Sequence, residues 1–85
     1  MSSHQITFYS ADWCGDCFRS KRVLDSYPLK YDLIDIEKDV AATERVIEIN
    51  GGSRTIPVIV FPDGSHMTEP SDMALTAKLE ELSLI

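Results

Sequence analysis

The sequence has few basic residues, only two cysteines and no long apolar run. Eight lysines and arginines stand against 14 aspartates and glutamates, which gives a net charge of −6 over 85 residues. Nucleic-acid binding requires a basic face, so this composition argues against that class of partner. No segment approaches the roughly 20 apolar residues of a membrane-spanning helix, so we expect no membrane insertion. The length suits a single domain over residues 1–85, which we expect to act as a monomer.

The first five residues contain no basic segment followed by an apolar stretch. We therefore expect no secretory signal and a cytoplasmic location. Cytosolic thiols are kept reduced, so a permanent structural disulfide is not expected there. The two cysteines, Cys14 and Cys17, would also close a very short loop, which removes little chain entropy. We therefore expect the pair to perform chemistry.

Hydrophobic periodicity predicts four strands along the chain. The expected strands are 5–9, 31–36, 57–61 and 66–68. Strand 31–36 is the more apolar of the first two and is expected in the interior of the sheet. The β-branched run 57–61 is expected as a buried central strand. The Pro62-Asp63-Gly64 turn predicts that the last strand returns antiparallel.

Three helices are expected between and after these strands. The first begins at Cys14 and is closed by Pro28, because a proline ring cannot follow a continuing helical turn. The second is expected to end at Asn50-Gly51-Gly52. The third begins with Ser71 as its N-cap. The apolar stripes are expected to be Cys17, Lys21 (its stem), Leu24 and Tyr27 in the first, Val40, Thr43, Val46 and Ile47 in the second, and Leu75, Leu79 and Leu82 in the third.

The predicted order is β-α-β-α-β-β-α. Its first half requires a parallel pair of strands with a right-handed crossover, whereas the Asp-Gly turn requires an antiparallel pair at the end. A four-stranded mixed sheet flanked by three helices satisfies both requirements. The predicted fold class is therefore α/β.

The two cysteines lie between the first strand and the first helix. Cys14 is expected at the helix N-terminus, where free backbone N–H groups and the helix dipole lower a thiol's pKa from about 8.5. Cys17 lies one turn further along the same face and is expected to be deeper. The spacing therefore predicts Cys14 as an exposed nucleophile and Cys17 as the thiol that resolves a mixed disulfide.

Other uses of a cysteine pair remain open at this point. A zinc site needs four ligands, and His4 and His66 are the only histidines that could join the cysteines, with no second paired motif. We therefore expect no metal site within one chain. An iron–sulfur cluster shared between two chains and a pair of buried, inert thiols are further alternatives.

Charged and aromatic residues flank the cysteines. Asp12 and Asp16 would oppose formation of a thiolate at Cys14, while the nearby Arg19, Lys21 and Arg22 supply positive charge. If Asp16 acts in this way, its replacement by Asn should lower the pKa of Cys14. Trp13 is expected to form a flat apolar wall that shapes access to the sulfur.

Taken together, these features resemble the thioredoxin fold and, within it, the glutaredoxin-like branch, in particular the mycoredoxin group of actinobacterial redoxins. The resemblance covers nearly the whole chain. The stretches that support it are Trp13-Cys14-Gly15-Asp16-Cys17, residues 31–37, residues 50–57 and residues 63–71. The resemblance implies a cis peptide bond between Ile56 and Pro57 beside the sulfurs. It also implies that a thiol or substrate is bound by Trp13, Arg54, Thr55, Ile56, Pro57, Ser71 and Asp72.

By the same resemblance, the chain is expected to reduce mixed disulfides between proteins and a low-molecular-weight thiol. In mycoredoxins this thiol is mycothiol, so mycothiol is the expected co-substrate and no tightly bound cofactor is expected. The implied partners are mycothiol-modified or disulfide-containing proteins, and mycothiol with its NADPH-dependent reductase. The segment Glu69-Pro70-Ser71-Asp72 departs from the Gly-Gly-x-Asp pattern of glutathione-using glutaredoxins, which favours a sugar-based thiol over glutathione.

Two alternative functions remain. One is a dithiol electron donor reduced by thioredoxin reductase, as in redoxins that serve ribonucleotide reductase, although the Gly-Phe-rich segment of that group is absent. The other is an iron–sulfur cluster carrier that holds its cluster through Cys14.

Overall fold

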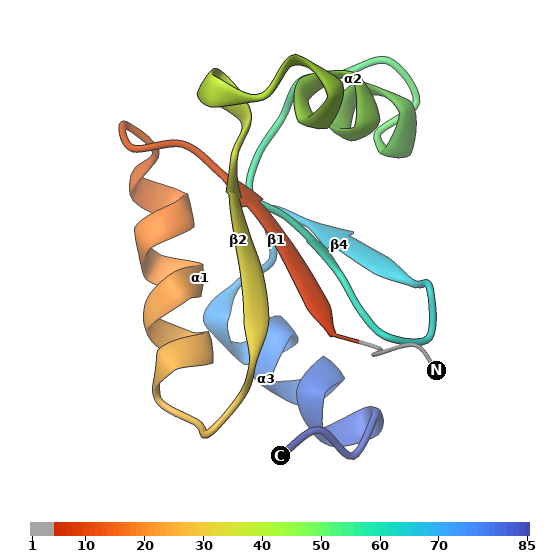
Figure 1. Cartoon of the computed structure of the whole chain (residues 1–85). Helices are drawn as coiled ribbons and strands as arrows, with labels where there is room; N and C mark the ends of the chain where they lie inside the picture. Colours follow the sequence, from red (N-terminus) through yellow and green to blue (C-terminus); the bar gives the residue numbers. More distant parts are fainter. Residues whose placement is uncertain (1–4) are drawn as a thin grey trace.

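The computed structural model describes residues 5–85 and contains a four-stranded sheet with the strand order β2-β1-β3-β4 (Figure 1). The strands are β1 (Ile6–Ser10), β2 (Tyr31–Asp35), β3 (Val58–Val60) and β4 (His66–Thr68). The helices are α1 (Gly15–Asp25), α2 (Val40–Ile49) and α3 (Asp72–Glu81), and a short 3-10 helix η1 (Ile36–Lys38) precedes α2. The predicted order of strands and helices is therefore confirmed. Residues 1–4, which include His4 and most of the segment searched for a secretory signal, lie outside the described residues.

The sheet is mixed, as the sequence predicts. β1 pairs with β2 in parallel and with β3 antiparallel, and β3 pairs antiparallel with β4. Phe8 lies at the centre of this arrangement, opposite Leu33 on β2 and Ile59 on β3. The parallel pair is connected through α1, whereas the antiparallel pair β3–β4 is connected by the predicted tight turn, in which Gly64 has a positive φ of 91°.

The position of β2 differs from the prediction. We expected strand 31–36 in the interior of the sheet, but β2 lies at the edge and pairs only with β1. Leu33 is accordingly half exposed, and Asp32 is also exposed. The apolar composition misleads here because hydropathy reports burial of a strand's faces, whereas strand order depends on which backbones pair. The expected central position of the 57–61 run is confirmed by β3, although the strand itself is shorter.

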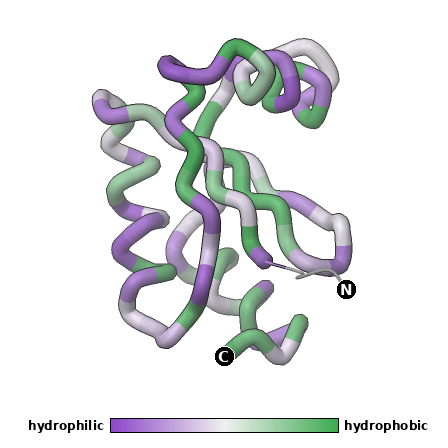
Figure 2. The backbone as a smooth tube through the Cα atoms, viewed as in Figure 1, coloured by the Kyte–Doolittle hydropathy of each residue, from purple (hydrophilic) through white to green (hydrophobic). Residues whose placement is uncertain are grey.

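The core lies on both sides of the two central strands. Figure 2 shows hydrophobic residues concentrated along the strands, while α1 is largely hydrophilic. α1 and α3 pack against each other, and α2 lies across the sheet from α3 (Figure 1). The fully buried side chains include Phe8, Leu24, Val46, Val58, Ile59, Phe61, Leu75 and Leu79.

The helix ends follow local sequence signals. Ser71 caps α3, because its hydroxyl oxygen accepts a hydrogen bond from the Ala74 N–H at 3.1 Å. α2 ends at its C-cap Asn50, and Gly51 follows with a positive φ of 73°. The end of α1 is earlier than predicted: the last helical residue is Asp25, three residues before Pro28.

The buried faces of the helices confirm most, but not all, of the predicted stripes. In α3, Leu75 and Leu79 are fully buried and Leu82 is partly buried, as expected. In α2 the buried residues are Ala42 and Val46, whereas Val40 is 76% exposed. The prediction for Val40 is wrong because it is the first residue of α2, where the chain has just left the exposed Asp39 cap.

Candidate functional site

The two cysteines form a disulfide at the junction of β1 and α1. β1 ends at Ser10, a short loop follows, and Cys14 occupies the N-cap position of α1 in an extended conformation. The Cys14 N–H donates to the Ala11 carbonyl at 3.2 Å, which closes the loop. The Cys17 N–H donates to the Cys14 Sγ at 3.1 Å, so one of the free N–H groups of the helix N-terminus points at this sulfur.

The cysteines are less accessible than the sequence suggested. Cys14 is 6% exposed and Cys17 is 3% exposed, so both belong to the core cluster that also contains Ile56. Cys17 is the less exposed of the two, as predicted. The prediction that Cys14 is exposed is wrong for this oxidised form. Its sulfur is bonded to that of the deeper Cys17, and the residue is buried with Cys17 and Ile56 in the core cluster.

A groove of about 400 Å³ lies beside the disulfide and is lined by Trp13, Ser53, Arg54, Thr55, Ile56 and Glu69. It brings together four of the seven residues expected to bind a thiol. Trp13 is 65% exposed and forms one wall, while the 53–56 segment forms the other. Pro57 follows this segment through a cis Ile56–Pro57 peptide bond, as the resemblance implied. Pro57 itself is fully buried.

A hydrogen-bond network holds the 53–56 wall of the groove. The Asn50 side-chain amide donates to the carbonyls of Ser53 and Thr55 at 3.0 and 2.9 Å, and its oxygen accepts from the Thr68 hydroxyl at 2.7 Å. Arg54 extends away to form a 2.7 Å ion pair with Glu37. From the sequence, Asn50 is expected only to end a helix. Its position directly before Gly51-Gly52 gave no signal for this second role.

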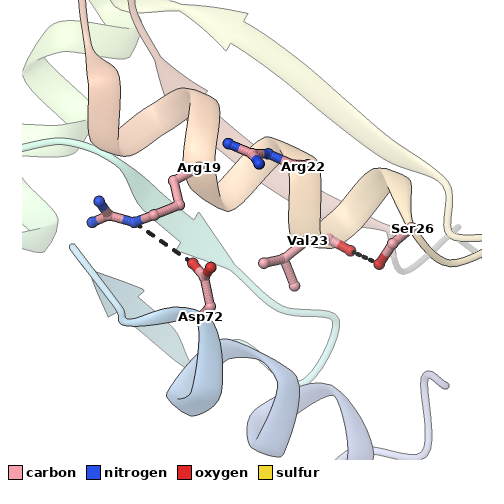
Figure 3. A pocket seen from close by; sticks show the side chains of 5 residues that line it. All are labelled: Arg19, Arg22, Val23, Ser26 and Asp72. Carbon is pink, nitrogen blue, oxygen red and sulfur yellow. Dashed lines mark hydrogen bonds and ion pairs between the residues drawn. The ribbon is translucent and has the colours of Figure 1, made fainter.

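Ser71 and Asp72 do not line this groove. The Ser71 hydroxyl is used for the cap of α3, and Asp72 faces a separate cavity of about 320 Å³ between α1 and α3. This cavity is lined by Arg19, Arg22, Val23, Ser26 and Asp72 (Figure 3). The structure therefore gathers Trp13 with the 54–56 segment in one groove, whereas Asp72 lines a different cavity and the Ser71 hydroxyl caps α3.

The acids of the motif differ in their surroundings. Asp16 lies in the first turn of α1 and forms a 2.7 Å ion pair with Arg19. The Arg19 Nε also lies 3.6 Å from the Asp72 carboxylate, as the dashed line in Figure 3 marks. Asp12 forms no ion pair within residues 5–85. The charge of Asp16 is therefore compensated, in contrast to the charge of Asp12.

A third cavity, of about 240 Å³, reaches Cys17 from another side. It is lined by Phe8, Ser10, Ala11, Asp12, Cys17, Phe18, Lys21 and Leu33. Phe18 and Leu33, which are 57% and 50% exposed, are apolar residues at its edge. No sequence pattern predicted this cavity, because it depends on β2 being the edge strand.

Lys21 belongs to a small polar network beside this cavity. Its Nζ donates to Asp25 at 2.7 Å, and the Tyr31 hydroxyl donates to the other Asp25 oxygen at 2.5 Å. The hydrogen bond to Asp25 raises the pKa of Lys21, and the bond from Lys21 lowers the pKa of Asp25. Burial is the main cause that raises the pKa of Tyr31, and its bond to Asp25 adds to this.

Within residues 5–85, no group of three or more His, Cys, Asp and Glu side chains is arranged to hold a metal ion. His4, one of the two histidines that could have joined the cysteines at a zinc site, lies outside this range. In the same part of the chain, no helix has both the length and the apolar character needed to cross a bilayer.

The chain is similar to known glutaredoxins and to a mycoredoxin. The family model described as glutaredoxin matches residues 6–67. A glutaredoxin-like protein of Mycobacterium tuberculosis is 42% identical over 83 residues, which are 98% of this chain and 99% of the relative. Mycoredoxin 1 of Corynebacterium glutamicum is 38% identical over 92% of this chain and 96% of its own length.

Two further matches concern the alternatives. The glutaredoxin-like protein NrdH of Lactococcus lactis is 33% identical over 85% of this chain and 99% of its own length. Among solved structures, glutaredoxin from Archaeoglobus fulgidus superposes with a TM-score of 0.74 and 26% identity, covering 93% of this chain and 85% of that one. The mixed sheet with three helices is thus the thioredoxin-like fold seen in glutaredoxins.

Proposed function

The chain belongs to the glutaredoxin family of thiol–disulfide oxidoreductases, which use a low-molecular-weight thiol as co-substrate, and on that premise we propose that its thiol is mycothiol. The observation that supports this most is the 38% identity to Mycoredoxin 1, which extends over 92% of the chain. The expected substrates are proteins that carry mycothiol in a mixed disulfide. Mycothiol and its NADPH-dependent reductase would return the protein to its reduced form.

Cys14 is the proposed nucleophile. Its position at the N-cap of α1, with the Cys17 N–H directed at its sulfur, favours the negative charge of a thiolate. The thiolate attacks the mycothiol sulfur of the substrate, a Cys14–mycothiol disulfide forms, and the protein thiolate leaves. A second mycothiol thiolate then attacks the bound mycothiol sulfur, which releases mycothiol disulfide and restores the Cys14 thiolate. One disulfide is consumed and one is formed in each step.

The groove beside the disulfide is the proposed binding site for the thiol. Trp13 provides an apolar wall, and the backbone of Ile56 is proposed to pair with a peptide-like portion of the ligand, as an edge strand does. Glu69 adds a negative charge to the same groove, which disfavours the carboxylates of glutathione. Arg54 is held by Glu37, so its positive charge is partly compensated. A sugar-based thiol without carboxylates fits this arrangement better.

Release of mycothiol from a mycothiolated protein tests the proposal. The wild-type chain, Cys14→Ser and Cys17→Ser are each incubated with the modified protein, mycothiol, its reductase and NADPH. We expect Cys17→Ser to retain the activity and Cys14→Ser to lose it, because the cycle described above uses one cysteine. Loss of activity in both variants would favour a dithiol mechanism instead.

The second candidate function is a dithiol electron donor. It is favoured by the Cys14–Cys17 disulfide and by the match to the glutaredoxin-like protein NrdH. In this cycle Cys17 attacks the mixed disulfide on Cys14 and expels the substrate thiolate. The iron–sulfur carrier remains a prediction, and visible absorbance after anaerobic purification would support it.

A further inference from the structure

One guanidinium connects the redox motif to the last helix. The Arg19 Nη2 lies 2.7 Å from the Asp16 Oδ1, and the Arg19 Nε lies 3.6 Å from the Asp72 Oδ1. Asp16 lies in the first turn of α1, two residues after Cys14, and Asp72 is the first residue of α3. Figure 3 shows the Arg19 side chain reaching from α1 toward Asp72. The contact therefore joins the N-terminal turns of two helices that are far apart in the sequence.

Asp16 is the nearest acid to Cys14 on α1. A carboxylate in the first turn of the helix that Cys14 caps opposes the thiolate, because two like charges repel more strongly in the partly desolvated region beside a protein than in bulk water. A positive charge paired with that carboxylate cancels much of its field at the sulfur. Arg19 supplies this charge, since it forms the shorter of its two ion pairs with Asp16.

We propose that Arg19 is a positioning residue of the redox site, which cancels the charge of Asp16 beside Cys14 and ties the first turn of α1 to the first turn of α3. The inference rests on the proposed role of Cys14 as a thiolate nucleophile. Arg19 does not contact the reacting sulfur; it acts through Asp16 and Asp72.

Arg22 offers a matched control within the same helix. It lines the same cavity as Arg19 and carries the same charge, but it forms no ion pair with any residue in the range 5–85. Replacement of either arginine by Gln removes one positive charge from α1. Only the replacement of Arg19 also releases Asp16 and Asp72, so the comparison separates a specific pairing from a general change in charge.

Other charged groups surround the site and remain unchanged in these variants. Asp12 lies on the loop before Cys14 and shares a cavity with Cys17 and Lys21. Arg54 and Glu69 lie across the groove. Their contributions to the Cys14 thiolate are the same in both arginine variants and therefore cancel in the comparison.

The first experiment measures the pKa of Cys14 from the pH dependence of its alkylation rate, in a Cys17→Ser background with a single thiol. We expect Arg19→Gln to raise this pKa by about half a unit, which is about threefold less thiolate at a pH below the pKa. Arg22→Gln should shift it much less. The double variant Asp16→Asn/Arg19→Gln should return to the background value. Equal shifts in the two arginine variants, or no recovery in the double variant, would overturn the electrostatic part of the proposal.

The second experiment measures amide hydrogen exchange in the first turn of α3. The N–H groups of Ala74 and Leu75 bind the side chain and the carbonyl of Ser71, so they report opening of this turn. We expect faster exchange at both amides in Arg19→Gln and in Asp72→Asn, and unchanged exchange in Arg22→Gln. Unchanged exchange in the first two variants would overturn the tie between the helices.

Neither readout involves mycothiol or any other low-molecular-weight thiol. The two proposals can therefore fail separately. If the mycothiol proposal is wrong, the chain does not release mycothiol from proteins, but the pKa of Cys14 still responds to Arg19→Gln as described.

Discussion

The side-chain amide of Asn50 donates a 2.9 Å hydrogen bond to the carbonyl of Thr55, so the end of α2 holds one wall of the groove beside the disulfide. The same side chain also binds Ser53 and Thr68. It therefore connects α2, the 53–56 segment and β4 at one point. A wall held in this way presents the same backbone to each incoming thiol.

Replacement of Asn50 by Ala should loosen this wall. The carbonyls of Ser53 and Thr55 lose a donor and Thr68 loses an acceptor, so we expect the free energy of unfolding to fall by about 1–3 kcal/mol. We also expect KM for the thiol to rise more than kcat falls, because the wall binds the ligand but does not react. Urea unfolding and steady-state kinetics measure the two effects. Thr68→Val is the control, since it removes one bond of the network and leaves both carbonyls bound; a KM increase as large in this control would contradict the assignment.

Replacement of Asp16 by Asn should lower the pKa of Cys14. The expected decrease is only a few tenths of a unit, because Arg19 already compensates the Asp16 carboxylate. The pH dependence of alkylation in a Cys17→Ser background measures it. Glu44→Gln removes one negative charge from the exposed side of α2 and serves as the control. An unchanged or higher pKa of Cys14 in Asp16→Asn would show that Asp16 is solvated surface without influence on the thiol.

Two replacements of Ser71 separate its structural role from thiol binding. Ser71→Ala removes the N-cap of α3 and should cost about 0.5–2 kcal/mol of stability, whereas Ser71→Asp keeps a capping oxygen and should cost much less. Thermal or urea unfolding measures this difference. Because the hydroxyl was also expected to bind a thiol, KM is measured for both variants. An increase in both supports direct binding, while an unchanged KM in Ser71→Asp restricts Ser71 to the cap.

The Asp25 network predicts a particular dependence of stability on pH. The pKa of Asp25 is lowered in the folded chain, first by the bond from Lys21 and then by that from Tyr31. A carboxyl with a lowered folded pKa contributes stability above its unfolded pKa of about 4, and this contribution is lost as the pH falls through the lower folded value. The stability difference between the wild-type chain and Asp25→Asn should therefore be constant near neutral pH and shrink below about pH 4.

The alkaline side of the same curve depends on Tyr31 and on Lys21, whose pKa values are both raised in the folded chain. Because the pKa of Tyr31 is raised, its contribution is complete below the unfolded value of about 10 and is lost as the pH rises through the folded value. Urea unfolding at a series of pH values records both limbs. Tyr31→Phe should reduce the alkaline loss and leave the part that comes from Lys21, whose pKa is also raised by its hydrogen bond to Asp25. A curve for Asp25→Asn that runs parallel to the wild-type curve at acid pH would contradict the assignment of Asp25.

The sequence predicted features that depend on local signals. The positions of Cys14 and Cys17 at the start of a helix, the Ser71 cap and the Leu75–Leu79 stripe follow from residues close to one another in the chain. The cis peptide bond at Pro57 followed only from the resemblance to a family. Each of these features is present in the structure.

The features that the sequence did not predict depend on packing between distant segments. β2 is an edge strand because β1 pairs with both β2 and β3, a choice that the hydropathy of residues 31–36 does not encode. Arg19 and Asp72 meet because α1 packs against α3, and Asn50 reaches Thr55 because the chain turns back after α2. Cys14 is buried because it lies in the core cluster with the distant Ile56, which the local sequence around the motif does not encode.

Reduction of the oxidised protein by three NADPH-driven systems separates mycothiol from its alternatives. Mycothiol with its reductase, glutathione with its reductase, and thioredoxin reductase are each offered to the Cys14–Cys17 disulfide, and NADPH oxidation is followed together with the free thiols formed. We predict that mycothiol with its reductase restores both thiols and that glutathione is much slower. Restoration by thioredoxin reductase alone, with none by mycothiol, would contradict the proposed function and favour the dithiol electron donor.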